Sequence, residues 1–376
     1  MLNLSSGRWF LVLVVATAAL FARPADAQFR IGILGDSISA NYPTTGRGGP
    51  PNYDRSWVQI QQDINGSAIQ FNNQSVDGME TPDPISGGQV NNLRNAVGAG
   101  QLDGVGIELG VDDIASGHLV DVFTGAMSTQ SIANEIITNL TTICNTIESG
   151  PRQVPMFVAT IPDFLQTTYF RDMMSLIPAY TPGEPMNPLL QQLLAEAPAQ
   201  FRNLVENGVS QAQVNAGVAN LSAAILAANH DIELLDAQRN YGYVDLYGVL
   251  HIYGSGDVVL GSTPVPQDLL YSEYDDWHSS SILSAMASNV AIEATVKEGF
   301  NTQGLILSDQ QILSYWDSHA SVQLPVTGND TYVIDSEMLN YLTTDPLAVP
   351  EPPIGVIVAA LAVCMLPLVR ARRMAA

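Results

Sequence analysis

The chain has 376 residues, of which 46% are apolar, and it carries a formal net charge of −23. An apolar share of this size can form the core of one large domain or two ordinary ones, so overall disorder is not expected. The acidic excess argues against nucleic acid as a partner, because phosphate contacts need clustered Lys and Arg.

The first 27 residues (1–27) predict a secretory signal peptide. Arg8 precedes an apolar stretch from Trp9 to Phe21, and the small residues Ala25 and Ala27 follow it. A transmembrane anchor is the alternative, although the stretch is short for a membrane span. Either segment leads us to expect the body of the protein outside the cytoplasm.

Short apolar runs alternate with helical patterns over residues 28–300, which favours parallel βαβ units over a sandwich. We therefore expect a three-layer α/β/α domain with a five-stranded parallel sheet. The expected strands are Ile31 to Leu34, Ile69 to Asn72, Val105 to Leu109, Met156 to Ile161 and Ile232 to Leu235. The expected helices lie near Ser56 to Ile64, Gly88 to Val97, Ser128 to Ile147, Pro198 to Ala228 and Ser279 to Lys297.

A Gly-Asp-Ser run ends at Ser37, directly after the first expected strand. The carboxyl end of such a strand is where an open α/β sheet presents catalytic groups. Asp275 stands three residues before His278, the one place in the chain with this Asp-His spacing. Because a serine hydroxyl needs a base and the base needs an orienting carboxylate, we expect a hydrolase. Ser37 would be its nucleophile, His278 its base and Asp275 the orienting acid.

Two long segments follow the ends of expected strands and are candidates for shaping a ligand site. The first is Asn41 to Asp54, which is rich in Gly and Pro. The second, Phe164 to Ala197, is a candidate lip beside the substrate, and a packed surface excursion is the alternative. Cys144 falls on the apolar stripe of an expected helix, so we expect it to be buried.

The remaining motifs indicate no metal and no organic cofactor. Four histidines outside the Asp-His motif share no metal-ligand spacing. They are His118, His230, His251 and His319. The sequence has neither a phosphate loop nor a dinucleotide fingerprint, and the absence of a Gly-x-Ser-x-Gly elbow argues against the α/β-hydrolase fold.

Over roughly residues 30–300 these motifs resemble the SGNH, or GDSL-type, family of esterases and lipases. Ser37 matches the first block, the Asn-Gln-Ser-Val-Asp-Gly run ending at Gly78 matches the second, and Asp275 with His278 matches the last. The resemblance implies a cofactor-free mechanism through an acyl-enzyme. It also implies that backbone N–H groups of Ser37 and Gly78 face the oxyanion.

The third block departs from the family pattern. The family expects Gly-x-Asn-Asp, whereas this chain has Asp112 at the position of the asparagine. The family asparagine donates an N–H to the developing oxyanion, but an ionised aspartate can only accept. Three outcomes stay open: Asp112 is protonated and donates, the backbone donors alone give a slow enzyme, or catalysis is lost while the fold is kept.

The end of the chain resembles a sorting signal. Residues 301–348 show no recognisable chemistry and are expected to form an appendage and linker. In residues 349–376, a Pro-Glu-Pro motif precedes an apolar run from Ile354 to Val369, and a basic cluster follows. This arrangement resembles the PEP-CTERM tail of exported bacterial proteins, which implies export and sorting machinery as partners and a C-terminal membrane segment. A simple C-terminal anchor is the alternative.

Taken together, these features predict an exported serine-dependent hydrolase at the cell envelope or outside the cell. Its substrate would be a lipid ester or an acetylated-carbohydrate ester. The alternative is a catalytically weak or inactive envelope or matrix protein that binds a glycan or lipid in the same cleft. A purely structural surface protein is a third possibility.

Overall fold

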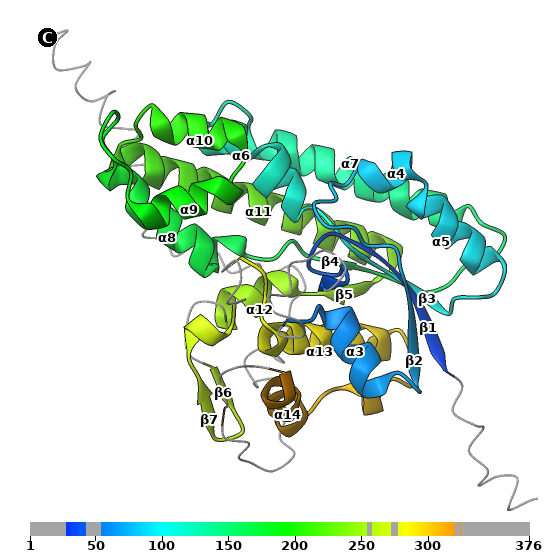
Figure 1. The fold of residues 1–376 in the computed structure, drawn as a ribbon. Coiled ribbons are helices and arrows are strands. Elements are labelled where there is room, and N and C mark those ends of the chain that lie inside the picture. Colours follow the sequence, from blue (N-terminus) through cyan, green and yellow to red (C-terminus); the bar gives the residue numbers. More distant parts are fainter. Residues whose placement is uncertain (1–27, 43–53, 254–257, 272–276, 320–323, 325–376) are drawn as a thin grey trace, which may run out of the picture.

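A sheet of five parallel strands lies at the centre of the protein (Figure 1). The computed structural model describes residues 28–42, 54–253, 258–271, 277–319 and 324. The strands are β1 (Phe29–Gly35), β2 (Ile69–Asn73), β3 (Gly104–Glu108), β4 (Met156–Ala159) and β5 (Gly242–Val244). Their order is β2-β1-β3-β4-β5, and every neighbouring pair is parallel. The predicted five-stranded parallel sheet is confirmed, and all five carboxyl ends meet at one edge.

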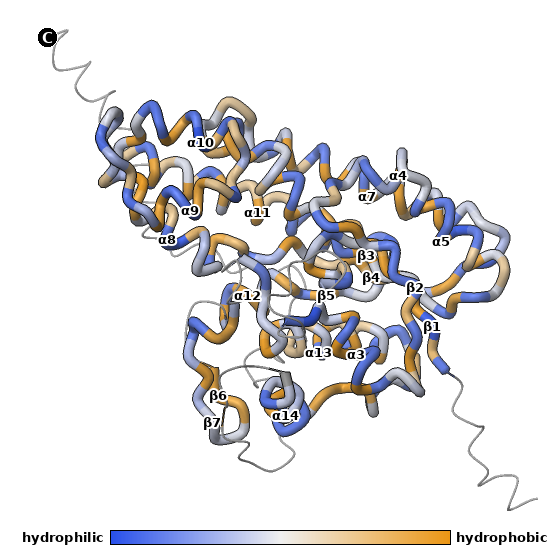
Figure 2. Tube along the Cα trace, viewed as in Figure 1, coloured by the Kyte–Doolittle hydropathy of each residue, from blue (hydrophilic) through white to orange (hydrophobic). Residues whose placement is uncertain are grey.

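Helices cover both faces of the sheet and complete the three predicted layers (Figure 1). One face carries α5 (Gln89–Gly98), α7 (Thr129–Glu148) and α11 (Gln211–Arg239), and the other carries α3 (Trp57–Asn65) and α13 (Ser281–Lys297). Side chains alternate between the layers along β1, so that Leu34 packs with the first group and Ile33 with the second. Orange and blue alternate along α5 and α7 in Figure 2, as expected for amphipathic helices with an apolar side on the sheet, whereas α13 is buried on nearly all sides.

A capping residue on α3 also positions the loop after β1. Ser56 Oγ accepts a hydrogen bond from Gln59 N at 3.4 Å, and Ser56 N donates to Gln59 Oε1 at 3.1 Å. This reciprocal arrangement is a capping box, which satisfies two donors at the start of the helix. Gln59 Oε1 accepts in addition from Tyr42 N at 3.1 Å. The start of α3 is therefore joined to the segment that follows Ser37.

The strand predicted at Ile232 to Leu235 is wrong, because these residues belong to the long helix α11. Their buried neighbours recur every three or four residues along the helix, and the preceding stretch is rich in the good helix former alanine. The helix continues to Asn240, which adopts the left-handed conformation with φ 54°. The fifth strand begins only two residues later and has three residues, too few to show a pattern in the sequence.

Two excursions leave the carboxyl edge of the sheet. The first excursion (residues 164–206) comes between β4 and α11 and consists of a 3-10 turn (Phe164–Gln166), α8 (Thr168–Leu176), a 3-10 turn (Ile177–Ala179), α9 (Pro188–Glu196) and α10 (Ala199–Glu206). The second excursion (residues 246–271, described except 254–257) holds α12 (Leu246–Tyr253), β6 (Val258–Leu260), β7 (Thr263–Val265) and a 3-10 turn (Gln267–Leu269). The segment predicted as a lip is therefore mostly helical. The predicted helix Pro198 to Ala228 is divided into α10 and α11, with Gly208 at φ +90° between them.

Four shorter elements connect the layers. They are α4 (Asp83–Gly87), a π-helical turn (Asp113–Gly117), α6 (Leu119–Thr124) and a 3-10 turn (Gln303–Leu305). The buried Phe123 of α6 contacts Phe201 of the first excursion edge to face, with ring centroids 5.3 Å apart. This aromatic pair joins the first excursion to the layer formed by α7 and α11.

Beyond the last predicted helix, the chain continues into the packed body. Helix α14 (Asp309–His319) buries Ile312, Leu313 and Trp316 in the same core cluster as α3 and α13. Tyr315 on this helix donates its hydroxyl to Asp63 Oδ2 at 2.6 Å. The predicted signal peptide and sorting tail lie outside the described residues, and within the described part no helix is long and apolar enough to cross a bilayer.

Candidate active site

Ser37 lies at the carboxyl end of β1, buried with only 4% of its surface exposed. The preceding residue Asp36 anchors the turn, since its Oδ1 accepts from Ile38 N at 3.0 Å and its carbonyl accepts from Ala40 N at 3.0 Å. Gly35 is required by close approach, because a Cβ there would lie 2.9 Å from the carboxylate of Glu108. The serine is thus held at the edge of the sheet by a tightly packed turn.

Gly78 belongs to a loop that is tied directly to this turn. Val76 N donates to the carbonyl of Gly35 at 3.0 Å, and Asn73 Nδ2 donates to the carbonyl of Ser39 at 2.7 Å. Gly78 itself has φ +73°, a backbone conformation that L side chains rarely adopt, although a Cβ would meet no neighbour within 4 Å. The sequence block ending at Gly78 therefore lies beside the turn that carries Ser37.

Asp112 and Asp113 lie at the end of the neighbouring strand β3. Asp112 is buried and accepts a hydrogen bond from Ser116 Oγ at 2.9 Å. Asp113 accepts from Thr81 N at 2.9 Å and from Thr81 Oγ1 at 2.5 Å. Since Thr81 follows Gly78 by three residues, Asp113 holds the Gly78 loop against the end of β3. Thr81 could not be identified from the sequence, because a single threonine carries no motif.

Replacing Thr81 by valine should destabilise the protein by about 1 to 3 kcal/mol, because the buried Asp113 would lose its shortest hydrogen bond. Asn139 Nδ2, which donates to Thr81 Oγ1 at 3.0 Å, would lose its acceptor as well. Urea unfolding measures the loss. Thr81→Ser retains the hydroxyl and is the matched control, so equal destabilisation of both variants would contradict this role for the hydrogen bonds.

His278 lies on the same edge of the sheet as Ser37. Its ring packs edge to face against Tyr42, five residues after Ser37, with ring centroids 5.5 Å apart, and only 3% of His278 is exposed. The next residues are fixed to the second excursion, where Ser280 N donates to the carbonyl of Leu270 at 2.9 Å. Asp275, the predicted orienting acid, lies outside the described residues.

Trp277, the residue before His278, joins this segment to the first excursion. Its ring lies 5.5 Å from that of Phe164 and 5.5 Å from that of Tyr169, both measured between centroids. Phe164 begins the excursion directly after β4, and Tyr169 belongs to α8. The residue before His278 is therefore clamped by aromatic packing, which fixes the segment that carries the imidazole.

A pair of buried carboxyl groups lies beneath the turn that carries Ser37. Asp36 is fully buried and Glu108 is 4% exposed. Burial and the charges of Glu108 and Asp112 raise the pKa of Asp36 well above its usual range, and burial raises the pKa of Glu108 to about 8. Glu108 Oε2 accepts from Ser39 Oγ at 2.8 Å, and Ser39 Oγ accepts from Trp57 Nε1 at 2.8 Å. At neutral pH the pair therefore retains a proton.

This proton makes the free energy of unfolding depend on pH. The folded protein keeps the proton of Glu108 up to about pH 8, whereas the unfolded chain releases it near the ordinary pKa of a glutamate, 4.5. The free energy of unfolding should therefore fall as pH rises between these values. Glu108→Gln imitates the protonated form and should raise Tm at pH 8 by about 3 °C or more relative to wild type. Calorimetry at pH 5 and pH 8 tests this, with the exposed Glu184→Gln as control; an equal gain at both pH values would contradict it.

An Asp-His pair that the sequence does not predict lies at this edge. His251 Nδ1 lies 2.8 Å from Asp163 Oδ2, and the His251 ring stacks on Tyr247 with centroids 5.2 Å apart. The hydrogen bond with Asp163 raises the pKa of His251. The two residues are 88 positions apart in the chain, so no local spacing could reveal them.

Among the described residues, no group of three or more His, Cys, Asp and Glu side chains could hold a metal ion.

Comparison with known proteins gives likenesses of structure alone. No family model matches the chain, and no curated protein sequence matches it. The YXIM protein of Bacillus subtilis is similar at 14% identity and TM-score 0.41, covering 73% of this chain, which spans only 58% of that protein's length. An extracellular lipase from Streptomyces rimosus matches at 15% identity and TM-score 0.39, covering 72% of this chain and 99% of the lipase. A catalytic mutant of an acetylxylan esterase from Geobacillus stearothermophilus matches at 14% identity and TM-score 0.37, covering 74% and 98%. The fold assignment therefore stands on the strand order and layers of the chain itself.

Proposed function

We propose that the protein is a serine-dependent hydrolase of carboxylic esters that works through an acyl-enzyme. The observation that carries this proposal is the packing of His278 against Tyr42, in the segment that follows Ser37. Tethering of the Gly78 loop to the same turn supports it further. A nucleophile, a base and two backbone donors would then share one sheet edge.

In this mechanism Ser37 Oγ attacks the ester carbonyl carbon while His278 takes the hydroxyl proton. Asp275 would orient the imidazole and stabilise its positive charge. The carbonyl oxygen becomes an oxyanion that the N–H groups of Ser37 and Gly78 face, with Asp112 beside them. His278 then returns the proton to the leaving alcohol. Water next attacks the acyl carbon while His278 takes a proton from it, and the bond to Ser37 Oγ breaks as Oγ receives that proton and the acid leaves.

The substrate proposed is a lipid ester or an acetylated-carbohydrate ester at the cell surface. The signal-like segment before Gln28 and the sorting-like tail after Val349 support export, and the nine basic against 35 acidic residues between them favour neutral or cationic partners. Hydrolysis of acetylated sugars against p-nitrophenyl esters of graded chain length would separate the two substrate classes. Preference for the longest acyl chains would point to lipid.

Asp112 favours one competing function. A carboxylate at the position of an expected oxyanion donor suits a protein that binds a glycan or lipid in the same cleft without turning it over. A fluorophosphonate probe separates the two functions, because only an activated serine reacts with it. Labelling of the wild type that disappears in Ser37→Ala supports hydrolysis. A wild-type protein that stays unlabelled would leave the binding protein as the better account.

A further inference from the structure

A cavity lies at the edge of the sheet opposite to Ser37. It opens between the α7–β4 and α11–β5 connections and encloses about 160 Å³. Its rim carries Glu148, Arg152, Gln153, Arg239 and Asn240, and the ring of Tyr241 also lines it. The volume is far above the ~10 to 15 Å³ that a single water needs, so a small organic ligand can enter.

Two arginines in this cavity are held in place by protein acceptors. Arg239 donates to Glu148 Oε2 at 2.6 Å and to Asn145 Oδ1 at 2.8 Å, while Tyr241 donates its hydroxyl to Glu148 Oε1 at 2.6 Å. Arg152 Nη1 donates to the carbonyl of Leu102 at 2.9 Å. A guanidinium has five N–H donors, so each arginine keeps donors for a ligand after these bonds.

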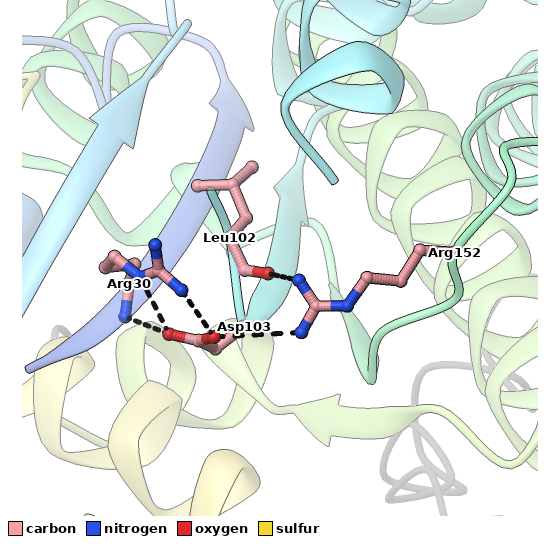
Figure 3. Close-up of polar contacts among 4 residues, drawn as sticks. All are labelled: Arg30, Leu102, Asp103 and Arg152. Atoms are coloured by element: carbon pink, nitrogen blue, oxygen red, sulfur yellow. Dashed lines mark hydrogen bonds and ion pairs between the residues drawn. The ribbon is translucent and has the colours of Figure 1, made fainter. Parts of the chain in front are cut away.

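The charge of Arg152 is only partly offset. Figure 3 shows its guanidinium beside Leu102 and Asp103, at 3.8 Å from Asp103 Oδ1. That carboxylate is already engaged by Arg30, which donates through Nε at 3.1 Å and Nη2 at 2.9 Å. Arg152 therefore brings net positive charge to the mouth of the cavity.

Arginines are frequent at this edge of an otherwise acidic protein, where the carboxyl groups of Asp103, Glu148 and Glu298 also lie. Four of the seven arginines among the described residues belong to it, namely Arg30, Arg94, Arg152 and Arg239. The buried carboxyl groups Asp36 and Glu108 lie at the other end of the strands. An anion near Ser37 would meet the charge of Asp112 beside this pair, so the arginine-lined cavity is the more favourable edge for it.

The helix ends define the ligand further. Helices α5, α7 and α11 all end at this edge with a partial negative charge, and capping N–H groups such as those of Ser149 and Asn240 bond only part of their last carbonyl oxygens. These ends and Glu148 disfavour a dianion such as phosphate but accept hydrogen bonds from hydroxyl groups. A ligand with one carboxylate and several hydroxyls satisfies both the arginines and the carbonyls.

From these contacts we infer that the cavity binds a carboxylated sugar unit. Arg152 and Arg239 hold the carboxylate, the amides of Gln153 and Asn240 bond the ring hydroxyls, and Tyr241 packs against the sugar. This site is independent of the proposed ester hydrolysis, because it lies on the far edge of the sheet and shares no residue with it.

Calorimetric titration of the full chain with sodium glucuronate tests this site. Glucuronate should bind at least tenfold more tightly than glucose and inorganic phosphate. Arg152→Gln should lose at least tenfold in affinity, because it removes the charge of a half-exposed side chain without disturbing the core. Asn240→Gly, which preserves the left-handed backbone, should lose about threefold.

Arg202→Gln on α10 and Ser37→Ala are the controls, and both should bind glucuronate as the wild type does. Retention of glucuronate by Ser37→Ala separates the fate of this site from that of the proposed hydrolysis. Equal binding of glucose or phosphate, no binding of glucuronate by the wild type, or full affinity in Arg152→Gln would each overturn the assignment.

Discussion

Replacing Ser37 by alanine should lower kcat/KM for ester hydrolysis by about a thousandfold or more. The hydroxyl is the atom that bonds to the acyl group in the proposed mechanism, and no other group can take over this bond. Ser37 is small and buried at a strand end, so losing one oxygen should leave the fold intact. Initial rates with a p-nitrophenyl ester, together with a Tm measured on the same sample, provide the measurement.

Two further variants test whether this loss is specific to Ser37. The exposed Ser86→Ala controls for the loss of any serine hydroxyl and should keep the wild-type rate. His278→Ala should lose about as much activity as Ser37→Ala, and the double variant no more than either single one, because nucleophile and base act as a unit. Full activity in Ser37→Ala, or losses that add in the double variant, would refute the assigned pair.

Replacing Asp112 by asparagine should raise kcat at neutral pH by about a hundredfold, since a single oxyanion donor is worth about a hundredfold to a thousandfold. Asparagine Oδ1 can keep the hydrogen bond from Ser116 Oγ, which leaves the new amide N–H₂ for the oxyanion. Removing the charge should also lower the pKa of Asp36 and of Glu108, because Asp112 raises both. Rates between pH 5 and pH 9 give the first effect, and the pH dependence of Tm gives the second.

Asp112→Ala separates the two contributions, because it removes the negative charge without adding a donor. If alanine and asparagine raise the rate equally, charge relief alone is responsible and the donor role is wrong. If asparagine lowers the rate, Asp112 already acts as a proton donor in the wild type. Only a gain confined to asparagine supports a missing N–H at this position.

The sheet was largely predictable from the sequence because its central strands are buried on both faces. The run from Val105 to Leu109 is short, largely apolar and bounded by Gly104 and Gly110, which distinguishes it from a helix. The fifth strand was missed for the opposite reason. The strand Gly242–Val244 is only three residues long. The apolar run from Ile232 to Leu235 looks like a strand in isolation, but the residues before and after it continue the pattern of a helix.

The sequence predicts the position of a residue at this edge only where that residue lies close to the end of a strand. Ser37, Gly78 and Asp112 each follow the end of a strand by a few residues, so the parallel topology brings their backbones to one edge. The carboxyl pair of Asp36 and Glu108 and the pair of Asp163 and His251 join distant positions through side chains. Such pairs depend on register and packing, which no single stretch of sequence encodes.

The buried acids beneath Ser37 also bear on how a reaction there would end. Ester hydrolysis converts a neutral substrate into a carboxylic acid that ionises on reaching water. A freshly formed anion would lie near the negative charge that Asp112 places beside Asp36 and Glu108, in a medium of low dielectric constant, whereas the neutral ester carries no charge to be repelled. The carboxylate product would therefore bind more weakly than the ester substrate. Product inhibition by the released acid would be weak as a result.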